Sequence, residues 1–159
     1  MEALYISITA ASSSYNADGA AALILTRRSV AEAKGLPILA VLKGHATDAR
    51  EPNWFTTAPI GAIQKLFAKT GWSAADVDLY EINEAFAVVP MAAIRDLGLD
   101  PTTVNVHGGA CALGHPIGAS GARIIVTLLN AMERQGAKRG VASLCIGGGE
   151  ATAVAVERL

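Results

Sequence analysis

Residues 108–123 read GGACALGHPIGASGAR, a glycine-rich stretch that leads into a long helical pattern. Pro116 suits the first position of a helix, where its missing N–H is not needed. His115 would then lie at the mouth of that helix, where free N–H groups and the helix dipole favour negative charge. Gly118 and Gly121 each cost about 1 kcal/mol relative to Ala inside a helix, which suggests that something approaches the backbone closely there. By itself, the pattern is equally typical of a tight helix-packing site.

On both sides of this stretch, the chain alternates apolar runs with helical patterns. The alternation opens with a short apolar run at 19–26, and strands are predicted at 38–45, 78–82, 103–106, 140–146 and 151–156. Helices are predicted at 27–34, 60–69, 84–97 and 116–136. The last two strands should pair antiparallel, whereas strands separated by helices should pair in parallel. The predicted fold class is α/β, with a mixed, mostly parallel five-stranded sheet and helices on both faces.

The charge balance excludes one class of partner. The 159 residues contain 13 basic and 14 acidic side chains, with a net charge of -1. Because phosphate neutralisation needs clustered Lys and Arg, nucleic acid is not an expected partner. Hydrophobic residues make up 52% of the chain, although aromatic residues make up only 5%. This apolar surplus indicates a face that packs on another domain or subunit, and we expect dimers or higher species.

Cysteine usage and chain patterning point to a cytoplasmic protein. The two cysteines, Cys111 and Cys145, do not make a disulfide framework, and both should be reduced in the cytosol. Glu2 directly follows Met1, and no cationic segment or long apolar run of the kind found in signal peptides is visible. No apolar stretch approaches the roughly 20 residues that a membrane helix needs, so no membrane association is expected.

A second motif, CIGGG at 145–149, follows a predicted buried strand. Three consecutive glycines leave backbone N–H groups unobstructed, which suits an oxyanion hole as well as a plain hairpin turn. The Cys145 thiol could act as a base or nucleophile if a neighbouring imidazole lowers its pKa. Its alternative role is that of a small core residue.

A third motif, NEAFA at 83–87, also follows a predicted strand. Asn83 could orient a water or hold a carbonyl by hydrogen bonding, or it could simply cap the following helix. In an open α/β sheet, the loops at the carboxyl ends of parallel strands gather at one crevice. We therefore expect Asn83, His115 and Cys145 to share one site.

Together these motifs resemble those of the thiolase family. NEAFA at 83–87, GGACALGHPIGASGAR at 108–123 and CIGGG at 145–149 occur in the family's order. The segment from Thr9 to DGAAA at 18–22 is similar to the one that opens the C-terminal half of thiolases. The resemblance spans nearly the whole chain and implies the fold of the thiolase C-terminal domain.

The resemblance implies a catalytic role for each of three residues. Cys145 matches the cysteine that removes a proton from the α-carbon of acetyl-CoA or returns it. His115 matches the histidine that holds the thioester oxygen as enolate character develops and supports the nucleophile. Asn83 matches the asparagine that fixes a water in the same oxyanion hole. A thioester α-proton is weakly acidic, so such a reaction needs both a base and enolate stabilisation.

The resemblance also implies a substrate-binding set. Gly147 matches a glycine whose N–H contributes to a second oxyanion hole, Ser14 matches a serine near the pantetheine arm, and Phe86 matches a phenylalanine that lines the pocket. The expected ligands are acyl-CoA and CoA as substrates. No resident cofactor and no metal are expected.

The predicted domain division is an extra segment at 1–8 followed by a thiolase C-terminal domain at 9–159. In thiolases, the cysteine that carries the acyl group belongs to the N-terminal half, and Cys111 is no substitute for it on family grounds. We therefore expect the chain to be inactive alone and to need an N-terminal thiolase half, or to form a homo-oligomer.

Two alternatives to a catalytic domain remain open at the level of sequence. The chain could be a non-catalytic module that binds CoA or assembles with another protein through the thiolase fold. A cysteine hydrolase built on Cys145 and His115 is a weaker alternative, because nothing in the sequence resembles a hydrolase signature.

Overall fold

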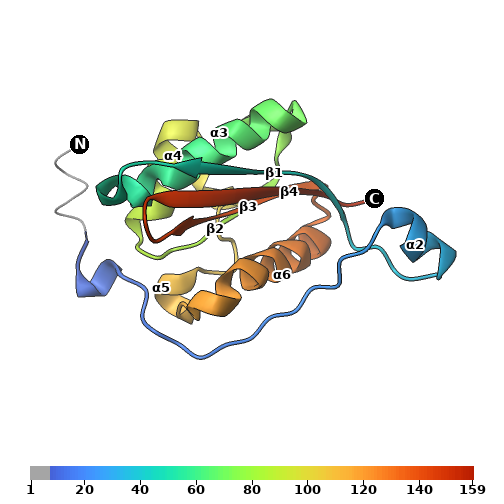
Figure 1. Cartoon of the computed structure of the whole chain (residues 1–159), viewed down its shortest axis with the longest axis horizontal. Helices are drawn as coiled ribbons and strands as arrows, with labels where there is room; N and C mark the ends of the chain where they lie inside the picture. Colours follow the sequence, from blue (N-terminus) through green and yellow to red (C-terminus); the bar gives the residue numbers. More distant parts are fainter. Residues whose placement is uncertain (1–7) are drawn as a thin grey trace.

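A four-stranded sheet in the order β1-β4-β3-β2 organises the fold (Figure 1). The computed structural model describes residues 8–159, so nearly all of the predicted extra segment lies outside the described residues. The strands are β1 (Val41–Ala49), β2 (Leu79–Ile82), β3 (Arg139–Ile146) and β4 (Glu150–Glu157). β2 pairs with β3 in parallel, whereas β4 pairs antiparallel with both β3 and β1.

The α/β class and the mixed sheet are confirmed, but the prediction of five mostly parallel strands is wrong. Residues 103–106 contribute only one bridge, Val104 to Tyr80, because a short 3-10 helix (Pro101–Thr103) occupies the start of this segment. The apolar run at 19–26 forms no strand in the described structure. β1 joins the free edge of the β3–β4 hairpin and pairs antiparallel with β4. The sequence pattern does not determine which edge of a sheet a strand joins.

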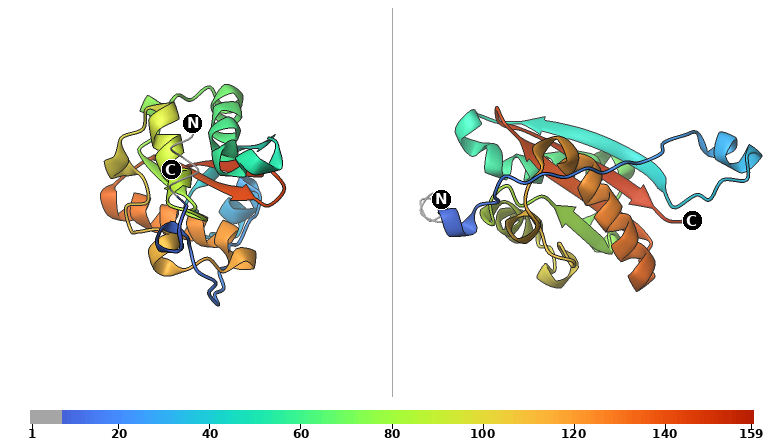
Figure 2. Two further views of the ribbon diagram at one scale, coloured as in Figure 1. Left: turned by 90° about the vertical axis from the view of Figure 1, so that its left-hand side faces the viewer. Right: turned by 90° about the horizontal axis from the view of Figure 1, so that it is seen from below.

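Helices cover both faces of the sheet, as predicted (Figures 1 and 2). α3 (Ala58–Thr70) and α4 (Val88–Leu97) lie on one face, and α6 (Ile117–Gln135) lies on the other. Of two shorter helices, α5 (Ala110–Leu113) lies beside the start of α6, whereas α2 (Arg28–Ala33) projects from the far end of the molecule (Figure 1). Over residues 8–159, none of the helices combines the length and the apolar composition that a membrane crossing requires.

Two hydrophobic clusters fill the spaces between the sheet and its helices. Successive side chains of a strand point to opposite faces, so Val141 and Cys145 join the cluster under α3 and α4, while Ala142 joins the cluster under α6. The apolar stripe of α6 includes Ile124 and Leu128, which recur at helical spacing and are fully buried. Burying one such side chain contributes roughly 1.5–3 kcal/mol, so packing rather than local propensity stabilises this helix.

The helix ends follow the predicted signals better than the helix starts do. Gly98 and Gly136 close α4 and α6 in the left-handed conformation, as expected for glycine. Asn83, in contrast, does not cap a helix, because α4 begins only at Val88. The Asn83 N–H instead donates to the carbonyl of Ser143 at 2.9 Å and continues the parallel pairing of β2 with β3. Asn83 therefore lies at the carboxyl end of β2.

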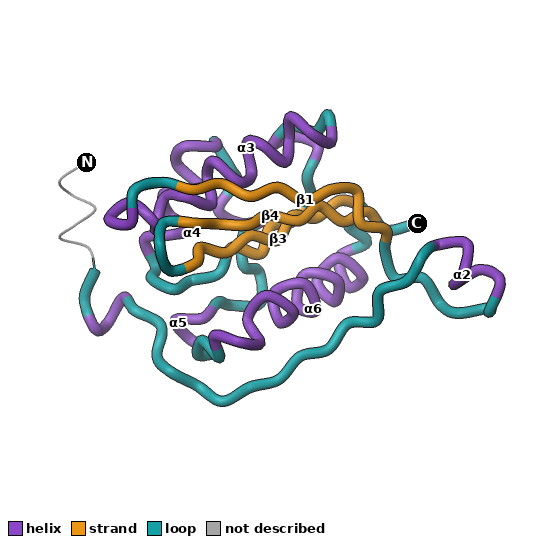
Figure 3. Tube along the Cα trace, viewed as in Figure 1, coloured by secondary structure: helices purple, strands orange, loops and turns teal. Residues whose placement is uncertain are grey.

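The segment before α2 is extended and runs along the side of the molecule that carries α6 (Figures 2 and 3). Its first part is tied to the body of the domain by backbone hydrogen bonds. The Ser14 N–H donates to the carbonyl of Ala85 at 3.1 Å, and the His115 N–H donates to the carbonyl of Tyr15 at 3.0 Å. These bonds bring the beginning of the chain next to two of the three motifs.

Candidate active site

An amide–imidazole pair lies where β2 ends. The Nδ2 atom of Asn83 is 3.3 Å from the Nε2 atom of His115, and the Asn83 side chain is buried. Asn83 is placed by the sheet, whereas His115 lies in the short connection between α5 and α6. The tertiary structure thus joins two motifs that are 32 residues apart in the sequence.

The imidazole of His115 is held at both of its ring nitrogens. Its Nδ1 atom lies 2.6 Å from the Oγ atom of Ser120, and that hydroxyl also donates to the carbonyl of Pro116 at 3.1 Å. Pro116 is the N-cap of α6 rather than its first helical residue, so the predicted start is displaced by one position. Burial, together with the positive charge of Arg123, lowers the pKa of His115 below its ordinary value. Both effects favour the neutral form of the ring.

A buried ion pair lies directly behind Asn83. The Arg123 guanidinium donates to the Oε2 atom of Glu81 through Nη1 and to the Oδ1 atom of Asn83 through Nη2, both at 3.3 Å. Glu81 is only 1% exposed, and its Oε1 atom has no hydrogen-bond partner in the described structure. Burial raises the pKa of Glu81 to about 7, although the nearby Arg123 charge opposes this shift.

Cys145 is the penultimate residue of the neighbouring strand β3. Its side chain is buried in the cluster under α3 and α4, and none of the hydrogen bonds in residues 8–159 joins it to Asn83 or His115. Burial raises the pKa of the Cys145 thiol to about 11. Burial disfavours the charged form of the thiol. Within residues 8–159, hydrogen bonding brings together Asn83 and His115 of the three predicted catalytic residues, and the role of Cys145 stays a prediction.

The three glycines after Cys145 form the turn of the β3–β4 hairpin. Gly149 has a φ of 102°, and its carbonyl accepts a hydrogen bond from the Arg50 N–H at 2.8 Å. A Cβ atom at Gly149 would lie 2.1 Å from the Arg50 carbonyl oxygen, so only glycine fits there. Gly147 is exposed, and a Cβ atom there would meet nothing within 4 Å. The two glycines therefore differ: Gly149 shapes the turn, and Gly147 borders open space.

Of the other two predicted binding residues, Ser14 contacts the NEAFA segment at 83–87 and Phe86 belongs to it. The Ser14 hydroxyl donates to the Ala85 carbonyl at 2.9 Å, which uses its one proton and leaves its lone pairs as acceptors. The Phe86 ring packs edge-on against Phe55, with 5.9 Å between the ring centroids, and contacts the same cluster that holds Cys145. The hydrogen bond to Ala85 therefore holds Ser14 beside the segment that also contains Asn83 and Phe86, and Phe86 packs against the cluster that contains Cys145.

Cys111 lies in a region shaped by the carboxylate of Glu84. The Cys111 N–H donates to Oε2 of Glu84 at 3.1 Å, and Asn105 donates to Oε1 at 3.1 Å. The Cys111 thiol is 3.6 Å from the Ser12 carbonyl and 3.8 Å from that of Glu84. Burial raises the pKa of this thiol, and the Glu84 charge raises it further. A thiol held in this way is a poor nucleophile.

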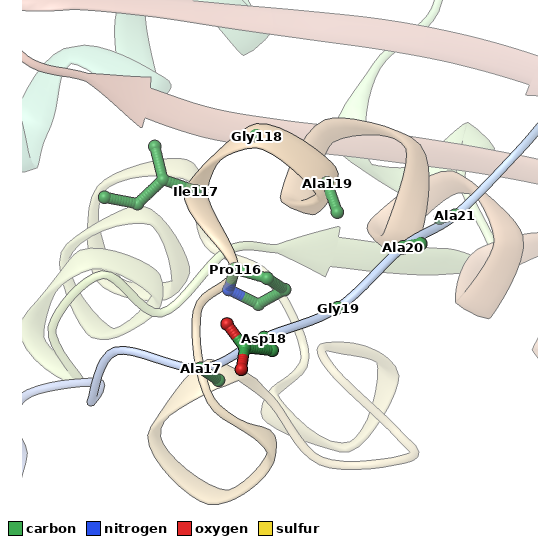
Figure 4. A pocket seen from close by; sticks show the side chains of 9 residues that line it. All are labelled: Ala17, Asp18, Gly19, Ala20, Ala21, Pro116, Ile117, Gly118 and Ala119. Carbon is green, nitrogen blue, oxygen red and sulfur yellow. The ribbon is translucent and has the colours of Figure 1, made fainter.

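A hollow of about 430 Å³ lies beside the start of α6 (Figure 4). It is lined by residues 17–21 of the extended segment and by residues 116–119. The close backbone approach expected at Gly118 and Gly121 does not occur within the described chain, because a Cβ atom at either would meet open space. The close approach falls at Gly19 and Gly114 instead, where an added Cβ atom would lie 2.7 Å from Pro116 and 2.5 Å from Ala17.

Three side chains of this site were not among the residues singled out from the sequence. Ser120 and Arg123 belong to the stretch 108–123. Both lie in the first turns of the predicted helix that follows His115, and this nearness could have indicated them. Glu81 precedes Asn83 by two residues, and strand periodicity places such residues on one face. In residues 8–159, no group of three or more His, Cys, Asp or Glu side chains is placed to hold a metal ion.

Solved structures define the class of this fold. A thiolase from Ascaris suum, solved in complex with coenzyme A, superimposes with a TM-score of 0.83 and 41% identity, covering 96% of this chain and 39% of that one. An acetyl-CoA acetyltransferase from Bacillus anthracis gives a TM-score of 0.81 and 44% identity, covering 83% of this chain and 34% of that one. The domain therefore has the thiolase architecture.

Sequence comparison identifies the part of a thiolase that the chain matches. The family model "Thiolase, C-terminal domain" matches residues 36–158, and the chain belongs to this family. The cytosolic acetyl-CoA acetyltransferase of Mus musculus is 52% identical over 151 residues, which are 95% of this chain and 38% of that protein. Acetyl-CoA acetyltransferase 1 of Arabidopsis thaliana is 50% identical over 151 residues, 95% of this chain and 36% of that protein. The chain thus spans little more than a third of the length of these relatives.

Proposed function

We propose that this chain forms the C-terminal part of an acetyl-CoA acetyltransferase, which catalyses reversible Claisen condensation or thiolytic cleavage of acyl-CoA. The observation that carries the proposal is the buried pair of Asn83 and His115 at the end of β2, in a chain about half identical to acetyl-CoA acetyltransferases. Neutral amide and imidazole groups in a site shielded from water are suited to stabilising a developing enolate oxygen.

In this proposal, His115 and Asn83 act on the thioester oxygen. Asn83 holds a water through its amide, and this water and the imidazole donate hydrogen bonds to the oxygen as negative charge develops. His115 also supports the nucleophile by accepting the proton of the acyl-carrying thiol at Nε2, which leaves the imidazole protonated at both nitrogens. The lowered pKa of His115 supports this role, because a neutral ring has a lone pair with which to accept that proton.

Cys145 is proposed as the residue that exchanges a proton with the α-carbon. The pKa of about 11 means that the resting thiol is protonated, so it is prepared to give a proton to the enolate carbon during cleavage. In the condensation direction, the same sulfur accepts the α-proton. For that step, the pKa of Cys145 must fall when the substrate is bound.

Three residues are proposed to bind the substrate: Ser14, Gly147 and Phe86. The hollow beside α6 offers a path for the pantetheine arm past residues 17–21, close in the chain to Ser14, whose hydroxyl can still accept a hydrogen bond. Gly147 borders open space, so its N–H can contribute to a hole around the acyl carbonyl. Phe86 contacts the cluster that contains Cys145, which suits a wall of the acyl pocket.

We propose that the acyl-carrying cysteine comes from residues outside these 159. Within the chain, the proposed division is an extra segment at 1–8 and a thiolase C-terminal domain at 9–159. The chain covers 38% of the mouse relative, and the shielded thiol of Cys111 does not suit the task. The 159 residues on their own are therefore expected to be inactive. The proposal includes a cytoplasmic location, supported by the cytosolic relative from Mus musculus.

A chimera tests this function. The matching C-terminal 151 residues of the mouse relative would be replaced by this chain, and CoA-dependent cleavage of acetoacetyl-CoA would be measured. We expect turnover by the chimera and none by the isolated chain. Cys145→Ser in the chimera should lower turnover by about 10²–10⁴-fold, the usual range for an acid–base group.

Three results of the chimera experiment would contradict the proposal. A folded chimera that binds CoA by calorimetry but has no turnover would favour a binding or assembly module. Turnover unaffected by Cys145→Ser would remove Cys145 from the mechanism. Cleavage by the isolated 159 residues would show that no outside cysteine is needed.

A further inference from the structure

The orientation of the Asn83 amide is set by a neighbour that can only donate hydrogen bonds. The two ends of an amide have nearly the same shape, so their hydrogen-bond partners determine which end is oxygen. A guanidinium has no acceptor, and the Nη2 atom of Arg123 lies 3.3 Å from the end of Asn83 assigned as Oδ1. The other end, which faces His115, must therefore be the NH₂ group.

The amide orientation in turn determines which imidazole nitrogen carries the proton. The Nδ2 group of Asn83 can only donate, so the Nε2 atom of His115, 3.3 Å away, must accept. In the neutral ring the proton is then on Nδ1, which donates to the Oγ atom of Ser120 at 2.6 Å. The Ser120 hydroxyl in turn donates a hydrogen bond to the Pro116 carbonyl at 3.1 Å. Every donor in this series of hydrogen bonds, from Arg123 to Pro116, meets an acceptor.

We propose that Arg123 is a positioning residue that sets the tautomer of His115 through the amide of Asn83. The flipped amide would bring the Nδ2–H of Asn83 against the N–H of Arg123, two donors facing each other. It would also turn Oδ1 toward His115 and require the Nε2–H tautomer. The clash with Arg123 disfavours this flipped state.

The guanidinium is fixed well enough to have this effect. Arg123 lies on α6, its side chain is 18% exposed, and Glu81 binds its other nitrogen at 3.3 Å. Glu81 and Asn83 project from the same face of β2, two residues apart, so one guanidinium spans both. Because Glu81 is buried, Arg123 cannot move away without leaving a carboxyl group that has no other hydrogen-bond partner in the described structure.

This inference rests on the proposed function for its meaning in catalysis. With Nε2 unprotonated at rest, its lone pair accepts a hydrogen bond from Asn83, and once this 3.3 Å contact opens it can accept the proton of a thiol, which then becomes a thiolate. Only after that transfer can Nε2 donate to a thioester oxygen. Arg123 would thus determine that Nε2 of His115 first accepts a proton rather than donating one, and it would do so without touching the substrate.

Imidazole ¹⁵N NMR of the 159-residue chain tests the tautomer without any turnover. His45 and His107, both exposed, would be replaced by Gln in every sample so that only His115 is observed. At about pH 8, above the ordinary histidine pKa, we expect a protonated Nδ1 and an unprotonated Nε2. Arg123→Met should shift the ring to a mixture of tautomers, and Glu81→Gln, which keeps the Arg123–Asn83 contact, should leave it unchanged.

Two further variants guard against loss of folding. Glu81→Gln combined with Arg123→Met removes both buried charges at nearly constant volume and should give the same mixture as Arg123→Met. Asn83→Asp replaces the donor by an acceptor and should move the proton of the neutral ring to Nε2. An Nε2–H tautomer in the otherwise unchanged chain would overturn the proposal, and so would an Nδ1–H tautomer that survives Asn83→Asp or the loss of Arg123. An inactive chimera with the predicted tautomers would instead count against the proposed function alone.

Discussion

The Nδ1 atom of His115 lies 2.6 Å from the Oγ atom of Ser120, five residues later in the chain. Ser120 is completely buried in the first turns of α6, so it cannot exchange this contact for water. The helix that follows the glycine-rich stretch therefore does more than pack against the sheet, because its start also holds the imidazole in place.

Removing the Ser120 hydroxyl should loosen that hold. Ser120→Ala leaves a partly buried imidazole nitrogen without its hydrogen-bond partner, and we expect the free energy of unfolding to fall by about 1–3 kcal/mol. The His115 Nδ1 resonance should shift as well. Ser143→Ala is the matched control, since Ser143 is equally buried but donates to the Thr152 carbonyl. It should affect stability without moving the His115 signal; an unchanged Nδ1 resonance in Ser120→Ala would contradict the prediction.

Glu81 should make the stability of the chain depend on pH. Burial raises its pKa from 4.5 to about 7, so between these values the folded state binds more protons than the unfolded state. Stability should therefore fall as the pH rises through this window, by roughly 2–4 kcal/mol. Urea unfolding at both ends of the window, compared with Glu81→Gln, isolates this contribution, because other titrating groups are common to both proteins. Parallel pH profiles for the two proteins would refute the assignment.

The hairpin glycines should respond differently to substitution. Gly149→Ala places a Cβ atom against the Arg50 carbonyl at a positive φ, and we expect a loss of about 1–3 kcal/mol of stability. Gly147→Ala meets open space and should change stability by less than about 0.5 kcal/mol. Thermal unfolding of the two variants measures this contrast. Equal effects would mean that the turn tolerates a side chain at either position.

The extended segment should promote self-association of the isolated chain. Ile24 is 93% exposed and Leu25 is 71% exposed, and both lie where the backbone has no strand partner in the described structure. We expect dimers or larger species by light scattering, with association weakened when both residues are replaced by Ser. Replacing two exposed polar residues of α2, Arg28 and Glu32, by Ser should not weaken it. A monomer at all working concentrations would contradict this prediction.

Much of the local structure could be predicted because it depends on neighbouring residues. The apolar stripe and closing glycine of α6 are periodic signals within one segment, and the predicted end at Gly136 is confirmed. The hairpin around 147–149 follows in the same way from two apolar runs that flank glycines. Asn83 was the ambiguous case, since an N-cap and a strand end have the same residue preferences.

The family, the order of most elements and the three motifs can all be read from the amino-acid sequence. The number of strands, the antiparallel edge, the burial of Cys145 and the contact of Arg123 with both Glu81 and Asn83 become visible only in three dimensions. This division arises because motifs and helix ends depend on adjacent residues. Strand pairing, desolvation and charge pairing depend on residues brought together from distant parts of the chain.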